Sequence, residues 1–138
     1  MKKNVKMILA TALLSATMVS SMGATPVFAA TSVSETLNNV TCSGSIVYSR
    51  NSSGVANGVT AMTGYGASAS ISATAIAYYN YGGTTRHTNP VTRTNTAGGV
   101  SATASADGLG TIKGGTGTHT VSITNSSWTG NTQIGIIS

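Results

Sequence analysis

Residues 67–81 read ASASISATAIAYYNY, and this stretch decides the fold class of the chain. Its odd positions all carry alanine, isoleucine or tyrosine, whereas its even positions are mainly serine and threonine. Because successive side chains of a β-strand point to opposite faces, this alternation places apolar groups on one face and hydroxyls on the other. The 15 residues exceed the usual strand length, so we expect a bulge, or a bend that passes the chain between two sheets.

The same period of two recurs along most of the remaining chain. Further strands are predicted at 44–50, 55–61, 84–96, 100–106, 109–113, 118–124 and 128–136, with Trp128 as a core anchor. Pro90 makes 84–96 an edge strand or an exposed hairpin, because proline cannot donate to a ladder. Glycine clusters, including 82–83 and 114–117, predict turns between strands. About seven strands at this spacing predict an all-β antiparallel β-sandwich, Ig-like or of a related Greek-key type.

The N-terminal segment differs in kind from the rest of the chain. Lys2, Lys3 and Lys6 precede an apolar stretch at 7–19, and Val27 and Ala29 fit positions −3 and −1 of a signal-peptidase site. This order is typical of a secretory signal peptide cleaved after Ala29, with an uncleaved N-terminal anchor as the alternative. The apolar stretch is short for a membrane span, so we expect membrane contact only through the transient signal.

Three segments follow from this interpretation. Residues 1–29 are the predicted signal peptide, 30–43 an N-terminal leader and 44–138 the β-sandwich domain. In the leader, Ser32 and Glu35 resemble a capping box, and we expect a short helical turn or a loose connection there. In composition and signal type the chain resembles small exported Ser/Thr/Gly-rich β proteins of Gram-positive bacteria. The expected localisation is secreted.

The charge of the precursor gives no indication of nucleic-acid binding. The formal net charge is +5, but three lysines belong to the predicted signal. The remaining chain has four basic residues, of which only Arg86 and Arg93 are close in sequence, and it has two acids, Glu35 and Asp107. Scattered cations of this kind form no patch that fits a phosphate backbone, so we expect no nucleic-acid partner.

The sequence contains little catalytic or metal-binding equipment. The candidate groups are His87, His119, Asp107 and Cys42, and their spacing matches neither a zinc motif nor a nucleophile elbow. The glycine clusters lack the P-loop order, so no cofactor is expected. We predict no catalytic residues and no metal site. Cys42 is the only cysteine, which predicts a buried small hydrophobe, with an intermolecular disulfide or a reactive thiol as alternatives.

One feature has binding character. Tyr78, Tyr79 and Tyr81 precede the Gly82-Gly83 turn, and Arg86 and His87 follow it. Their hairpin would end in aromatic and cationic side chains that suit protein or carbohydrate contact, although core tyrosines with one exposed partner are the simpler interpretation.

A weaker observation is a set of threonine rows at 92–96 and 116–120, which place hydroxyls on one strand face. Such rows are typical of the solvated side of a strand, and an ice-like or glycan-facing surface is the alternative.

These observations favour a secreted, non-enzymatic β-sandwich that acts by extracellular or cell-surface binding, or by self-association. The expected partner is a protein or glycan at the cell surface. The alternative is a secreted antagonist, such as a small toxin, bacteriocin or enzyme inhibitor, which a growth-inhibition assay would reveal. A hydrolase is the third class, and it would lose activity when His87, His119 or Asp107 is changed.

Overall fold

A computed structural model of the chain describes residues 31–49, 54–64 and 69–135. The described residues contain nine strands and no helix. The strands are β1 (Ser32–Leu37), β2 (Val40–Tyr48), β3 (Val55–Thr63), β4 (Ser70–Tyr81), β5 (Thr84–His87), β6 (Val91–Asn95), β7 (Gly99–Ser105), β8 (Thr111–Ile123) and β9 (Ser126–Gly135). The predicted signal peptide at 1–29 lies outside the described residues.

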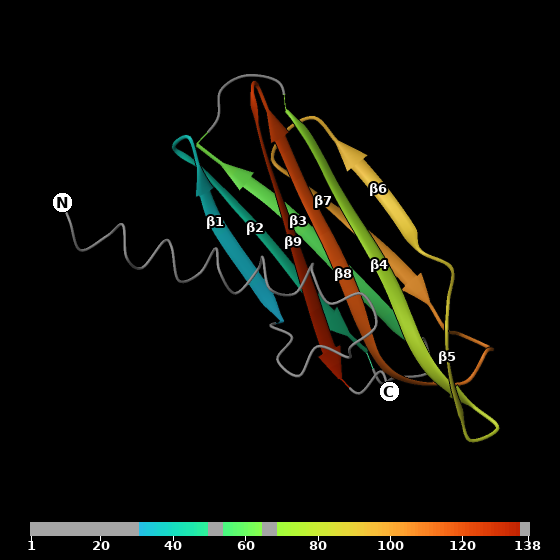
Figure 1. The fold of residues 1–138 in the computed structure, drawn as a ribbon. Helices are drawn as coiled ribbons and strands as arrows, with labels where there is room; N and C mark the ends of the chain where they lie inside the picture. The colour runs from blue at the N-terminus through green and yellow to red at the C-terminus, as the bar shows by residue number, and fades with distance from the viewer. Residues whose placement is uncertain (1–30, 50–53, 65–68, 136–138) are drawn as a thin grey trace, which may run out of the picture.

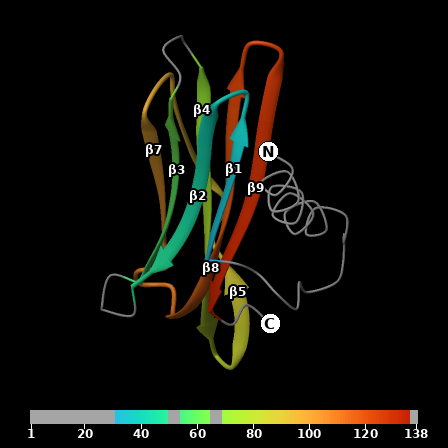
Figure 2. The same cartoon turned by 90° about the vertical axis from the view of Figure 1, so that its left-hand side faces the viewer.

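The strands form two antiparallel sheets that pack face to face (Figure 1). The first sheet has the order β1-β2-β3-β7. The second has the order β5-β4-β8-β9, and β6 pairs with the same edge of β4 as β5 does. Figure 2 shows β1 and β2 of the first sheet in front of β4 and β8 of the second. The all-β prediction is therefore confirmed, and the structure is consistent with a β-sandwich.

The strand that decides the fold class behaves as its alternation predicts. Ile71, Ala73, Ala75 and Ala77 are fully buried, and the residues between them are partly exposed. The expected bulge is present, because the register between β4 and β8 shifts between Tyr78 and Tyr79. The bulge is thus the one of the two expected alternatives that is observed, since β4 pairs with strands of the second sheet among the described residues.

The core between the sheets has two parts. One is built mainly from small side chains, among them Ala56, Ala75 and Ala104, and the other from larger ones that include Met62 and Trp128. Trp128 is buried, as predicted. Because alanine projects only a methyl group, the sheets lie close together at the first part of the core.

Three other expectations of local structure differ from what is observed. The segment 31–41 is not helical or loose, because β1 and the start of β2 pair there as strands. The segment 84–96 lies at an edge of the second sheet, as predicted, but it forms two short strands separated at Pro90, and the described residues contain nine strands instead of about seven. The predicted turn at 114–117 is wrong, since these residues lie inside β8.

Candidate functional site

The predicted binding residues lie on the hairpin that β4 and β5 form. Tyr78 pairs with His87, and Tyr79 pairs with Arg86. Gly82 and Gly83 both have positive φ and make the two-residue turn, a conformation that glycine adopts without steric cost. The Gly83 N–H donates to Asn80 Oδ1 at 3.0 Å, which closes the turn. Figures 1 and 2 both show the tip of this hairpin extending past the neighbouring strands.

The hairpin divides the five predicted residues between its two faces. On one face the Tyr78 and His87 rings lie with their centroids 5.8 Å apart. On the other face the Arg86 guanidinium carbon lies 5.1 Å from the centroid of the Tyr81 ring. Tyr79 shares this second face but packs against the alanine-rich part of the core. Tyr79 thus anchors the hairpin, whereas Tyr81 is 58% exposed and Arg86 is also exposed.

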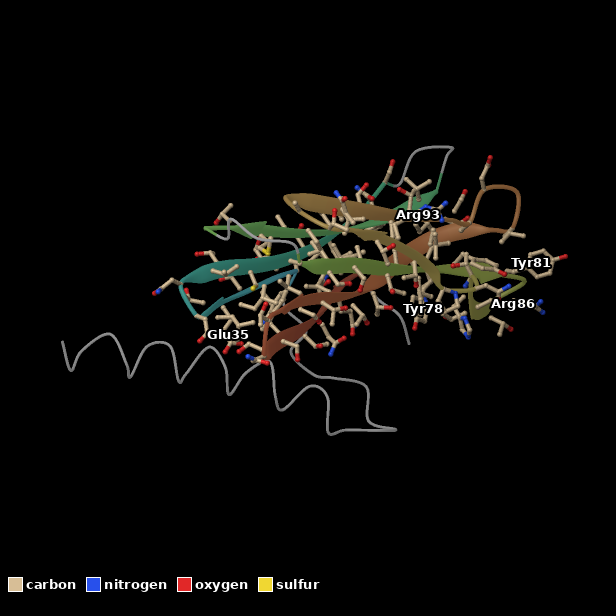
Figure 3. All side chains as sticks on the ribbon, turned by 90° about the horizontal axis from the view of Figure 1, so that it is seen from above. Glu35, Tyr78, Tyr81, Arg86 and Arg93 are labelled. Atoms are coloured by element: carbon tan, nitrogen blue, oxygen red, sulfur yellow. The ribbon has the colours of Figure 1, made fainter. Side chains whose placement is uncertain are left out.

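A lysine from a neighbouring strand joins this end of the molecule. Lys113 of β8 donates from Nζ to Thr85 Oγ1 at 3.2 Å, and Thr85 lies on β5. The basic side chains of Arg86 and Lys113 therefore flank the hairpin from both faces. Figure 3 places Tyr81 and Arg86 at one end of the sandwich and Glu35 at the opposite end. This separation leaves the hairpin tip with a basic and aromatic character.

The threonine rows continue across the outer face of the second sheet. Thr92, Thr74 and Thr118 lie side by side in strand register on β6, β4 and β8. Thr74 and Thr92 are joined by a hydrogen bond of 2.8 Å, and Thr118 donates to Asn131 Oδ1 on β9 at 3.0 Å. Ser72 and Thr120 are hydrogen-bonded in the same way. The result is an uncharged surface whose hydroxyls are held by one another.

Sequence reasoning placed His119 on a strand but missed its surroundings. His119 is fully buried between the sheets, with Nδ1 2.9 Å from Thr60 Oγ1 and Nε2 2.7 Å from Thr132 Oγ1. Thr60 belongs to β3 and Thr132 to β9, so the ring joins hydroxyls from both sheets. The available signal was the alternation of His119 with Val121 and Ile123, which placed it on the apolar face.

Gly44 and Gly117 make room for the imidazole, and Gly58 lies beside the ring at ordinary contact distance. A Cβ at Gly44 would overlap the His119 ring, and one at Gly117 would lie 2.8 Å from His119 Nε2. A Cβ at Gly58 would lie 3.7 Å from Cε1 of the same ring. Desolvation by burial lowers the pKa of His119 from 6.5 to about 4, because the charged form has lost its water. At neutral pH the ring is therefore neutral.

The other candidate groups have separate environments. Cys42 is buried in the larger-residue part of the core, and its pKa is raised by desolvation and then by the charge of Glu35. His87 is exposed, with Nδ1 3.0 Å from the Thr88 carbonyl oxygen, and Asp107 lies exposed between β7 and β8. Within 31–49, 54–64 and 69–135, no three His, Cys, Asp or Glu side chains come close enough to hold a metal ion.

No helix among the described residues is long and apolar enough to cross a membrane. No protein-family model, curated protein or solved structure matches the chain. The assignment of a candidate site therefore rests on the geometry of its residues alone.

Proposed function

We propose that this chain is a secreted, non-enzymatic β-sandwich protein that binds an acidic glycan at the cell surface through the β4–β5 hairpin. The observation that carries the proposal is the exposed pair of Arg86 and Tyr81 at the hairpin tip, with Lys113 at the other face. An aromatic ring offers a flat apolar surface to a sugar ring, and arginine pairs with carboxylate or phosphate groups. This geometry favours a negatively charged glycan over a neutral one.

Two further features support a contact surface at this end. Among the described residues the hairpin tip has open space around it, since a Cβ at Gly82 or Gly83 would meet none of their atoms within 4 Å. The core anchor Tyr79 holds the base of the hairpin, so the exposed side chains are positioned before a ligand arrives. The uncharged hydroxyl face begins on the same strand and could extend the contact along a longer glycan.

Export and strand connectivity belong to the same proposal. The signal peptide at 1–29 would be removed, and N-terminal sequencing of the exported protein should begin at Ala30. The chain passes between the sheets from β3 to β4, from β6 to β7 and from β7 to β8, and this connectivity supports an Ig-like or related Greek-key relation.

The binding proposal is tested with a polyuronate and a neutral glucan of similar length, using calorimetry on the purified protein. We expect measurable binding to the polyuronate, and we expect Arg86→Gln to weaken it about five-fold, equivalent to about 1 kcal/mol at an exposed cationic contact. Arg93→Gln is the matched control, because it removes the same charge from β6 instead of from the hairpin. Equal losses in both variants would indicate only a general charge effect.

Self-association through an edge strand is the other form of the proposal. Sedimentation of the purified protein separates the two forms, since self-association would give a concentration-dependent mass. A strictly monomeric protein that binds neither cells nor glycans would contradict both.

A further inference from the structure

The buried His119 has a defined pattern of donors and acceptors. The Thr60 hydroxyl donates to the Ser72 carbonyl oxygen at 2.8 Å, so its only proton is already used. Thr60 Oγ1 must therefore accept from His119 Nδ1–H across the 2.9 Å contact. Nε2 is then unprotonated and accepts from the Thr132 hydroxyl at 2.7 Å. The hydrogen bonds run in one direction from β9 through β8 and β3 to β4.

Among the residues that the structure describes, no charged side chain faces the ring to compensate a proton. The elements packed around it present Gly44 on β2, Gly58 and Thr60 on β3, Ala73 on β4 and Thr132 on β9. None of these side chains carries a charge. The pKa of His119 is lowered by burial alone, with no contribution from a charged group. On the neighbouring part of β2 the titratable group is Cys42, whose raised pKa keeps it neutral in acid, and Glu35 of β1 lies opposite Cys42.

We propose that Thr60, His119 and Thr132 form an acid-sensitive latch between the two sheets, and that proton uptake at His119 Nε2 loosens the sandwich. The added proton turns Nε2 from an acceptor into a donor, so the Thr132 hydroxyl can no longer donate to it. That hydroxyl must turn toward the Gly117 carbonyl oxygen, which lies 3.5 Å away. The core then holds a positive charge without a counter-ion, and opening the sheets to water relieves this cost.

The latch does not depend on the binding function of the hairpin. His119 is fully buried between the sheets, whereas the hairpin residues lie at one end of the molecule. An exported protein with this device would be closed at neutral pH and would open in an acidic environment. Its surface contacts would then be lost together with the packing of the sheets.

The only tryptophan of the chain provides the measurement. Trp128 is 5% exposed, so its fluorescence shifts to longer wavelength when the sandwich opens. We would hold the purified protein in urea just below its neutral-pH midpoint and lower the pH from 6.5 to 4.5. With a folded-state pKa of about 4 against 6.5, the opening equilibrium constant should rise about 40-fold.

Two variants make the test specific. His119→Gln keeps a donor and an acceptor but cannot take up a proton, so most of the acid response should disappear. His87→Gln removes the exposed histidine and should keep the response of the unmodified protein. The same acid response in His119→Gln and in the unmodified protein would overturn the proposal.

If His119→Gln does not fold, NMR of the unmodified protein decides the question. The ¹⁵N shifts of the His119 ring should show the Nδ1–H tautomer at neutral pH, and proton uptake by this ring should coincide with the exposure of Trp128. An Nε2–H tautomer, or a ring that titrates while Trp128 stays buried, would contradict the latch.

Discussion

A single imidazole ring explains why two glycines occupy strand positions near the centre of the sandwich. Gly44 and Gly117 both face His119 too closely for a Cβ, and neither has a positive φ. Their role is therefore the space that a missing Cβ leaves. Glycine in a strand interior normally weakens the strand, and here it allows a large polar ring to lie between two sheets. The two threonine hydroxyls satisfy both ring nitrogens, which removes the main cost of burying them.

Gly44→Ala should be strongly destabilising, because the new methyl group would overlap the His119 ring. We expect a loss of about 3 kcal/mol or more in the free energy of unfolding, measured by urea titration. Gly99→Ala is the matched control, since its Cβ would approach backbone oxygen no closer than 3.4 Å. The control should change stability by less than about 1 kcal/mol.

The source of the loss can be checked with a double variant. Combining Gly44→Ala with His119→Ala removes the ring that the methyl group meets, so the two losses should not add. A coupling of at least about 1 kcal/mol is expected, and strict additivity would show that the clash lies elsewhere.

Strands β4 and β8 set the spacing of the sheets. Both lie inside the second sheet and turn small residues toward the first sheet. Ala73, Ala75 and Ala77 do so on β4, and Gly115 and Gly117 do so on β8. A Cβ at Gly115 would lie 2.6 Å from the Ala56 Cβ of the opposite sheet. The sheets therefore approach too closely here for larger side chains.

Ala56→Leu tests this close approach. Ala56 is fully buried against Gly115, so the larger side chain should cost about 1–3 kcal/mol of unfolding free energy through overpacking. Ala61→Leu is the control on the same strand, because alternation turns Ala61 to the opposite face, where it is partly exposed. The control should stay within about 0.5 kcal/mol. Thermal or urea unfolding measures both, and equal losses would contradict the packing argument.

In the whole molecule, the buried polar side chain of His119 is neutral, whereas the charged side chains of the described residues lie at the surface. Glu35 and Arg86 lie at opposite ends in Figure 3, and Arg93 lies between them. The acid response of the whole domain should therefore include a large contribution from His119. The hairpin, in contrast, contributes contacts at one end and little to the core, apart from the packing of Tyr79.

The free energy of unfolding should fall in acid by an amount that the two pKa values set. The folded-state pKa of His119, about 4, lies below the unfolded value of 6.5, so the unfolded chain binds more protons between these limits. The stability is fully present above pH 6.5 and decreases as the pH falls toward 4. The loss attributable to His119 is about 3 kcal/mol, measured by urea titration at pH 7 and pH 4. A loss of the same size in His119→Gln would assign it to other groups.

The sequence by itself determined the local geometry of most of the chain. Alternation in 67–81 gave the face of every described β4 residue as far as the bulge, and the same pattern located Trp128 in the core. The predicted turn at Gly82-Gly83 is also confirmed, since both glycines have positive φ and the strands on either side pair with each other. All of these residues are neighbours in the chain. These features depend on neighbours within a few residues, so the order of the residues is enough to predict them.

Only the tertiary structure decided which strands meet and what the inward-facing groups contact. Glycine is used both in turns and where two sheets approach closely, and the sequence pattern does not distinguish the two uses. For this reason 114–117 was predicted as a turn, although these residues lie inside β8. Residues 31–41 have weak local preferences for any one secondary structure. They are extended because β1 pairs with β2. His119 is joined to Thr60, 59 residues away in the chain, and its burial and proton affinity follow from that contact. The physical reason is that desolvation and hydrogen bonding depend on distances in space, which alternation along the chain does not specify.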